Sequence, residues 1–253
     1  MKNKFSFISA AIAATLSTHT FAIGSSPASM SYVQTQVANV QTQLMNYVNS
    51  IVNAIPATPT YKVGDIALGG TVFYVDNTGT HGLVASPLYA GGDSSSAKSW
   101  VGVQPDTQDI FYFLVGAFGN GIGAGAMNTA LSSGGQSAYF AQNNQDYSDM
   151  AALYCVGLSA KADGQTPCSN PGAPGEPCYA DYYLPSNYEL YQMYLKRDIL
   201  HMWVDVDTTP AFVWSSTEID AQNAYRINVS ESDQELASVE KNAGCGVWCI
   251  RQF

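Results

Sequence analysis

The placement of cysteine is the sequence feature that most constrains how this chain can fold. None of the five cysteines precedes position 155; they are Cys155, Cys168, Cys178, Cys245 and Cys249. Cysteines used in this way favour disulfide bonds and an oxidising compartment over the reducing cytoplasm. Any disulfide therefore lies in the C-terminal half of the chain.

The spacing of the cysteines suggests which of them pair. Cys168 and Cys178 flank SNPGAPGEP, a segment whose prolines and glycines prevent a helix or a strand. A local bridge would stabilise this loop by limiting the unfolded chain. Cys155 lies in a helical-looking run and could be joined to the last predicted strand through Cys249, which leaves Cys245. A zinc site built from Cys245, Cys249 and the earlier pair is the alternative, but the spacing does not match the two-residue knuckle and no histidine is near.

The first residues have the pattern of a secretory signal peptide. Lys2 and Lys4 give a short positive region, Phe5 to Leu16 form an apolar stretch, and Thr20-Phe21-Ala22 is a small-x-small cleavage site. We predict that residues 1–22 are removed on export through the periplasm. A membrane anchor is the alternative, but the apolar stretch is too short to span a bilayer comfortably. The mature protein is therefore predicted to be secreted or exposed at the cell surface, without a transmembrane segment.

The charge balance excludes one class of partner. The chain has ten basic and twenty acidic residues, a net charge of -10. Without Lys2 and Lys4, eight basic residues face twenty acidic ones, so the mature chain has a net charge near -12. Such a surface repels nucleic acids and anionic lipids at long range. We expect no nucleic-acid partner.

Signatures of catalysis are missing from the sequence. It has no HExxH, GxSxG or GxxxxGK[ST] motif and no nucleophile–base pair at motif spacing. The segment GNGIGAG resembles a nucleotide-binding loop but lacks the βαβ context, and its glycines predict backbone flexibility before a helix. Asp146 with Asp149, and Asp205 with Asp207, offer oxygen ligands for calcium without the EF-hand pattern. We predict that the protein is not an enzyme and holds no metal or cofactor.

Residues 30–55 carry a heptad of apolar residues. One seam position holds Met30, Val37, Leu44 and Ile51, and the other holds Val33, Val40, Tyr47 and Ala54. This 3.5-residue period predicts a coiled coil, and β-branched residues at both seam positions favour a homotrimer. A single amphipathic helix packed on the domain is the alternative. Pro56 and Pro59 end the helix, so residues 23–60 are predicted to be a stalk and linker.

Residues 61–253 are predicted to form one α+β domain with short antiparallel strands and two or three helices. The expected strands are 71–75, 83–86, 212–216, 224–229 and 247–253, and Asp76-Asn77-Thr78-Gly79 is a turn between the first two. The expected helices are 128–131, 149–158 with Ser148 or Asp149 as N-cap, and one that begins after Ser186. Ser186 and Glu189 have the spacing of a capping box.

An ordered series of motifs in this domain resembles a known family. The segments GGTVFYVDNTGTHGLVAS, GNGIGAGAMNTAL, ADYYLPSNYELYQMY, VWSSTE and VWCIRQF follow one another between residues 63 and 253. In this order they look like the C-terminal domain of the Legionella collagen-like protein and its bacterial relatives. The resemblance implies a C-type-lectin-like fold in which a Cys155–Cys249 disulfide links a helix to the last strand. It also implies a surface adhesin that binds sulfated host polysaccharides and promotes clumping of cells.

Two features of this chain depart from that family. The collagen-like Gly-x-y repeats are absent, and only the heptad stalk precedes the domain. Sulfated glycans need a basic patch, yet Lys196-Arg197 is the only adjacent pair of cations in the mature sequence. We therefore expect weak binding to heparin-like polymers, and a ligand that is a surface glycan or a protein.

Candidate ligand-binding residues come from three places in the domain. The first is the segment Trp214-Ser215-Ser216-Thr217-Glu218, for which two interpretations are open. Either Thr217 and Glu218 lie at a ligand surface, or Trp214 anchors the core and the Ser and Thr hydroxyls bond backbone groups at the end of a strand. Alternation puts one of Tyr182 and Tyr183 inward and the other outward, where its ring could stack on a sugar. The cations Lys196, Arg197 and Arg226 complete the set. The predicted function is adhesin-type binding; a trimeric fibre tip without a dedicated ligand is the alternative.

Overall fold

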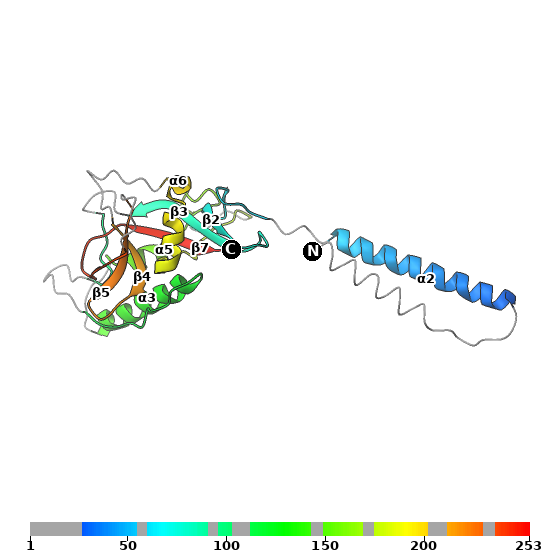
Figure 1. Ribbon diagram of the computed structural model, residues 1–253, viewed down its shortest axis with the longest axis horizontal. Coiled ribbons are helices and arrows are strands. Elements are labelled where there is room, and N and C mark those ends of the chain that lie inside the picture. Colours follow the sequence, from blue (N-terminus) through cyan, green and yellow to red (C-terminus); the bar gives the residue numbers. More distant parts are fainter. Residues whose placement is uncertain are drawn as a thin grey trace. The chain divides into compact units, whose positions relative to one another are not determined.

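The computed structural model describes residues 27–54, 60–90, 96–102, 112–142, 149–168, 175–201, 212–229 and 236–253 (Figure 1). The chain divides into two compact units, residues 1–58 and 59–253. The predicted signal peptide, residues 1–22, lies outside the described residues, as do Asp146, Asp205 and Asp207. Within the described part of the chain, no helix combines the length and the apolar character needed to cross a membrane.

The first unit contains one long helix, α2, from Pro27 to Ala54. Most of the predicted seam residues lie exposed on it, among them Met30, Val37, Val40, Leu44, Tyr47 and Ile51. Apolar side chains left in water lose the free energy that burial would supply. The predicted helix is confirmed, and its assembly into a trimeric coiled coil stays a prediction.

The first sheet of the second unit has four antiparallel strands in the order β1-β2-β3-β7. Their bounds are Ile66–Ala67, Gly70–Val75, Gly82–Ala90 and Val247–Gln252. The predicted hairpin of β2 and β3 is confirmed. Its turn forms because one Asp76 carboxylate oxygen accepts hydrogen bonds from the amides of Thr78 and Gly79, at 2.9 and 3.0 Å.

The second sheet has three antiparallel strands in the order β4-β5-β6, with bounds Phe212–Glu218, Asn223–Asn228 and Leu236–Glu240. The sequence predicted β4 and β5 but not β6. Asp220 forms the turn between β4 and β5 by accepting from the amides of Gln222 and Asn223. Two antiparallel sheets with a few helices confirm the α+β class.

Among the described residues of this unit, four helices accompany the sheets, which is more than the two or three predicted: α3 (Ala124–Gln142), α4 (Ala151–Val156), α5 (Asn187–Tyr194) and α6 (Arg197–Leu200). Both α3 and α5 pack on β4 (Figure 1). The predicted capping box at the start of α5 is present, with Ser186 and Glu189 bonded reciprocally. The N-cap predicted for α4 is wrong: α4 begins after Met150, and the carboxylate of Asp149 pairs with Lys98 instead.

The interior has two buried clusters, and β7 lies between them. Its residues alternate: Trp248 and Ile250 face the cluster around Phe73, and Val247 and Cys249 face the cluster around Trp100. This explains why β7 is buried on both faces.

Two disulfides tie this unit together. Cys155 of α4 is bonded to Cys249 of β7, as the family resemblance implies, and Cys168 is bonded to Cys178, as the local loop suggested. Cys245 is free and buried. The alternative of a zinc site is wrong, because four of the cysteines are used in disulfides.

Candidate recognition surface

The prediction that one of Tyr182 and Tyr183 points outward is wrong, because both side chains are buried. The segment that carries them runs between the two interior clusters. Tyr183 packs into the cluster around Phe73, and Tyr182 packs into the cluster around Trp100. Their hydroxyls also have internal partners, since Tyr182 donates to the carbonyl of Gly69 at 2.5 Å and Tyr183 donates to Glu189 at 3.0 Å. Neither ring is available to a sugar.

The WSSTE segment is likewise internal. Trp214, Thr217 and Glu218 are all buried, and the indole of Trp214 donates to the carbonyl of Lys98 at 2.8 Å. The reading of Trp214 as a core anchor is therefore the one that fits the structure. Thr217 and Glu218 do not form a ligand surface themselves, but both hold a neighbouring segment in place.

The predicted cations do not form a cluster. The guanidinium of Arg226 stacks on the ring of Phe212 at 3.6 Å, and that of Arg197 stacks on Tyr194 at 4.6 Å, next to Lys196 on the partly exposed start of α6. Arg251 of β7 lies in the first sheet, whereas Arg226 of β5 lies in the second, and Arg251 pairs with Asp181. These positions do not make a basic patch.

The segment that Thr217 and Glu218 hold is the strap, residues 112–123, which has no regular secondary structure and leads into α3. The carboxylate of Glu218 accepts hydrogen bonds from two strap amides, those of Val115 at 3.1 Å and Ala117 at 2.8 Å. A carboxylate is a strong acceptor for backbone N–H groups. The first half of the strap is thus fastened to the end of β4.

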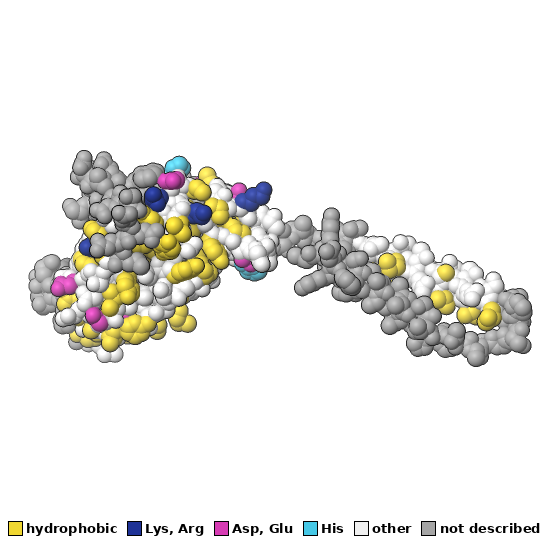
Figure 2. Space-filling model, in the orientation of Figure 1, with side chains coloured by type: hydrophobic (Ala, Val, Ile, Leu, Met, Phe, Trp, Pro, Cys, Tyr) yellow, Lys and Arg dark blue, Asp and Glu magenta, His cyan; other side chains and the backbone are white. Residues whose placement is uncertain are grey.

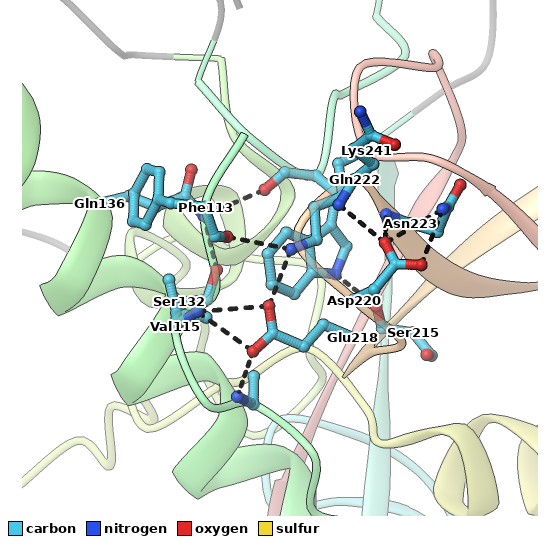
Figure 3. A network of polar contacts seen from close by, with 12 residues as sticks. Phe113, Val115, Ser132, Gln136, Ser215, Glu218, Asp220, Gln222, Asn223 and Lys241 are labelled. Atoms are coloured by element: carbon cyan, nitrogen blue, oxygen red, sulfur yellow. Dashed lines mark hydrogen bonds and ion pairs between the residues drawn. The ribbon is translucent and has the colours of Figure 1, made fainter. Parts of the chain in front are cut away.

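Lys241 completes this network (Figure 3). Its ammonium lies 2.7 Å from Glu218, donates to the carbonyl of Phe113 at 3.2 Å, and sits 4.5 Å from the ring centre of Trp100. Burial lowers the pKa of Lys241, and the carboxylate of Glu218 opposes that effect. Since each charge is buried beside its partner, the pair belongs to the structure of the domain rather than to a ligand site.

A second buried carboxylate, that of Glu189, fastens the other end of the strap. It accepts from the amides of Gly123 at 2.8 Å and Gly125 at 3.0 Å, as well as from the amide of Ser186 at 2.8 Å. The residue that completes the capping box of α5 therefore also sets the entry of the chain into α3.

Side chains of α3 and β4 hold the middle of the strap. The amide of Asn128 accepts from the N–H of Gly119 at 2.9 Å and donates to its carbonyl at 2.7 Å. Thr217 donates to the same carbonyl at 2.9 Å. One residue further on, the side chain of Asn120 accepts from the amide of Tyr188 at the start of α5, at 2.7 Å. Polar side chains thus fix the strap along its whole length.

Four apolar side chains on the strap or on the neighbouring start of α5 are exposed. Leu114 and Phe118 are each 54% exposed, Ile122 is 43% exposed, and Tyr188 of α5 is 44% exposed. These four residues are the strap surface. Figure 2 shows exposed hydrophobic side chains over this part of the domain, around α3 and α5. No residue between 112 and 142 is Asp, Glu, Lys, Arg or His, although the chain as a whole is acidic.

The lack of charged residues in this part of the sequence was a sign of the strap surface, but it did not show which side chains would be exposed. Residues 112–142 form an uncharged stretch that is unusual in so acidic a chain. The glycines in this stretch predicted only a flexible backbone. Nothing local indicated that Glu189 and Glu218, distant in sequence, would bind the strap backbone. Among the described residues, no three His, Cys, Asp or Glu side chains gather as they would around a metal ion.

No protein-family model matches this chain, and no curated protein matches it. Among solved structures, the chain is similar to a fimbrial protein from Bacteroides ovatus, with 18% sequence identity and a TM-score of 0.36. The similarity covers 68% of this chain and only 35% of the fimbrial protein. A likeness of this size assigns neither a fold family nor a function.

Proposed function

We propose that this chain is an exported recognition protein of the adhesin type, which binds a protein at a cell surface through the strap surface. The observation that carries the proposal is the combination of exposed apolar side chains with a backbone held by two buried carboxylates. Aromatic side chains are enriched in protein interfaces and often anchor them. A loop already fixed in one conformation also loses little entropy on binding.

The disulfides support the cellular location that this function requires. Cys155–Cys249 and Cys168–Cys178 are of the kind that persist in oxidising compartments and not in the cytoplasm. Together with the predicted signal peptide, they support export and exposure at the cell surface. The described cations lie in separate elements, with Arg226 in β5, Arg251 in β7 and Lys196 and Arg197 at the start of α6, which argues against the sulfated polysaccharide that the family resemblance implies.

The lack of charge on the strap surface favours a protein partner. Residues 112–142 contain no lysine or arginine that could pair with sulfate groups. An approaching acidic protein would also meet less repulsion here than on the charged parts of a chain with net charge -10.

A structural role at the tip of a fibre is the second candidate function. The observation in its favour is α2, whose exposed and uncharged seam residues would bring copies of the chain together. In that role the domain needs no dedicated ligand.

Binding of the fluorescently labelled mature chain to host and bacterial cells tests the proposal. Leu114→Ser combined with Phe118→Ser should weaken binding by about tenfold or more, as expected when interface anchors are lost. Met127→Ser is the matched control, because Met127 is an exposed apolar residue of α3 outside the strap surface. Circular dichroism should show all variants folded.

Equal binding by the three proteins would mean that the strap surface is not the recognition site. If the unaltered chain binds no cell and yet light scattering finds an oligomer, the fibre-tip role is favoured instead.

A further inference from the structure

A pocket of about 270 Å³ opens where β2 ends, β3 begins and β7 ends. The side chains that line this sheet-end pocket are those of Tyr74, Asp76, His81, Ile122, Gln252 and Phe253. Its volume is close to the lower end of the range for small-molecule sites, about 300 to 1,000 Å³. Only Ile122 is shared with the strap surface, so the pocket is a separate site.

The apolar wall of the sheet-end pocket is built from aromatic rings held in place by the sheet. Phe253 exchanges two backbone hydrogen bonds with Gly82, each of 3.1 Å, and its ring meets that of Tyr61 edge-on at 5.1 Å. Position 82 accepts only glycine, because a Cβ there would lie 2.7 Å from the Phe253 ring and 2.2 Å from the carbonyl oxygen of Tyr74. The backbone pairing with Gly82 and the contact with Tyr61 fix the Phe253 ring in the lining of the pocket, which Tyr74 also lines.

The polar groups of the sheet-end pocket suit hydroxyl groups. One oxygen of Asp76 is occupied by the turn, and the other lies 3.6 Å from Nδ1 of His81. Hydrogen bonds, above all from the hydroxyl of Thr78, lower the pKa of Asp76, so this carboxylate is ionised at neutral pH and accepts only. The amide of Gln252 both donates and accepts. Neither lysine nor arginine is among the lining residues.

We infer that the sheet-end pocket binds one ring of a neutral saccharide. The C–H face of a sugar ring fits against Tyr74 and Phe253, while its hydroxyls meet Asp76, His81 and Gln252. An anionic sugar is disfavoured, because the carboxylate of Asp76 lies in the lining and neither lysine nor arginine does. This inference goes beyond the protein contact proposed for the strap surface and does not depend on it.

Saturation-transfer NMR on the full mature chain tests this inference, with methyl glucoside, methyl galactoside and N-acetylglucosamine as neutral probes and glucuronate as the anionic comparison. We expect transfer to ring C–H protons of a neutral probe, with a Kd on the order of 1 mM. Tyr74→Ala should weaken this binding about tenfold or more. Gln252→Ala is the second variant, because Gln252 is exposed.

The controls separate this site from the strap surface. Phe118→Ser should leave the sugar signal unchanged even where it abolishes binding to cells. Three outcomes would overturn the inference: no transfer to any neutral probe, equal transfer in Gln252→Ala, or stronger transfer to glucuronate than to the neutral probes.

Discussion

Removing the charge of Glu218 tests how the strap is held. We expect Glu218→Gln to lower the free energy of unfolding by about 3–5 kcal/mol, the usual cost of leaving a buried charge without its partner. The side chain of Lys241 is 1% exposed and that of Glu218 is 0% exposed, so water cannot take the place of the carboxylate. Glutamine keeps the size of the side chain, which confines the loss mainly to the charge.

The double variant distinguishes the charge effect from a packing effect. In Glu218→Gln with Lys241→Met, no unpaired charge remains in the interior, and neutral side chains of similar volume often replace a buried ion pair at little cost. The double variant should therefore be more stable than Glu218→Gln alone. Glu176→Gln is the matched control, because Glu176 pairs with Lys161 at the same 2.7 Å but in a partly exposed position. It should cost no more than about 1 kcal/mol.

Urea unfolding at neutral pH with both disulfides intact measures these differences. For a chain of this size, a loss of 3–5 kcal/mol corresponds to a melting temperature lower by roughly 6–20 °C. Hydrogen exchange at the amides of Val115 and Ala117 should also become faster in Glu218→Gln. The reasoning fails if Glu218→Gln lowers the free energy of unfolding no more than Glu176→Gln does. It also fails if the double variant loses as much stability as Glu218→Gln alone and Lys241→Met alone add up to.

Four further outcomes are expected. Removing the Cys155–Cys249 disulfide should cost more than removing Cys168–Cys178, about 4.7 against 2.7 kcal/mol in the chain-entropy model for separations of 94 and 10 residues; equal losses in urea unfolding would contradict this. The mature chain should be an oligomer by light scattering, and replacing Val37, Val40 and Leu44 with serine should give folded monomers; an unaltered chain that is monomeric at micromolar concentration would refute the stalk prediction. Burial raises the pKa of Tyr182 to about 12, so its contribution to stability is present below pH 10 and is lost as the pH rises from about 10 to 12; Tyr182→Phe should flatten this part of the stability curve, and an unchanged curve would show that Tyr182 does not control it. Finally, the mature chain should pass through a heparin column at physiological salt, whereas firm retention would show that its net charge is a poor guide to its ligand.

Several parts of the fold could be predicted because a few neighbouring residues encode them. Asp76 and its turn define the first hairpin, and Ser186 with Glu189 defines the start of α5. The edge strand β6 was not predicted; it is five residues long and, among the described residues, pairs with β5 alone.

The candidate site was much less predictable than the fold. The strap is an irregular segment whose conformation depends on Glu189 and Glu218, which reach it from other elements. The sheet-end pocket depends on three strands ending at the same edge. Aromatic residues within the sequence motifs attracted attention as ligand contacts, yet Trp214 is part of the core.

The sequence by itself determined the helix of the stalk, the opening hairpin, the capping box and the local disulfide, because each arises from interactions within a short stretch of chain. Only the tertiary structure decided which side chains reach the surface. Successive side chains of a strand point to opposite faces, so every second side chain is exposed only when a single face of the strand is covered. Here Tyr182 and Tyr183 lie between two buried clusters, so both faces are covered and both rings are buried. The apolar side chains of the strap remain outside because its polar backbone is bound by buried carboxylates on its inner side.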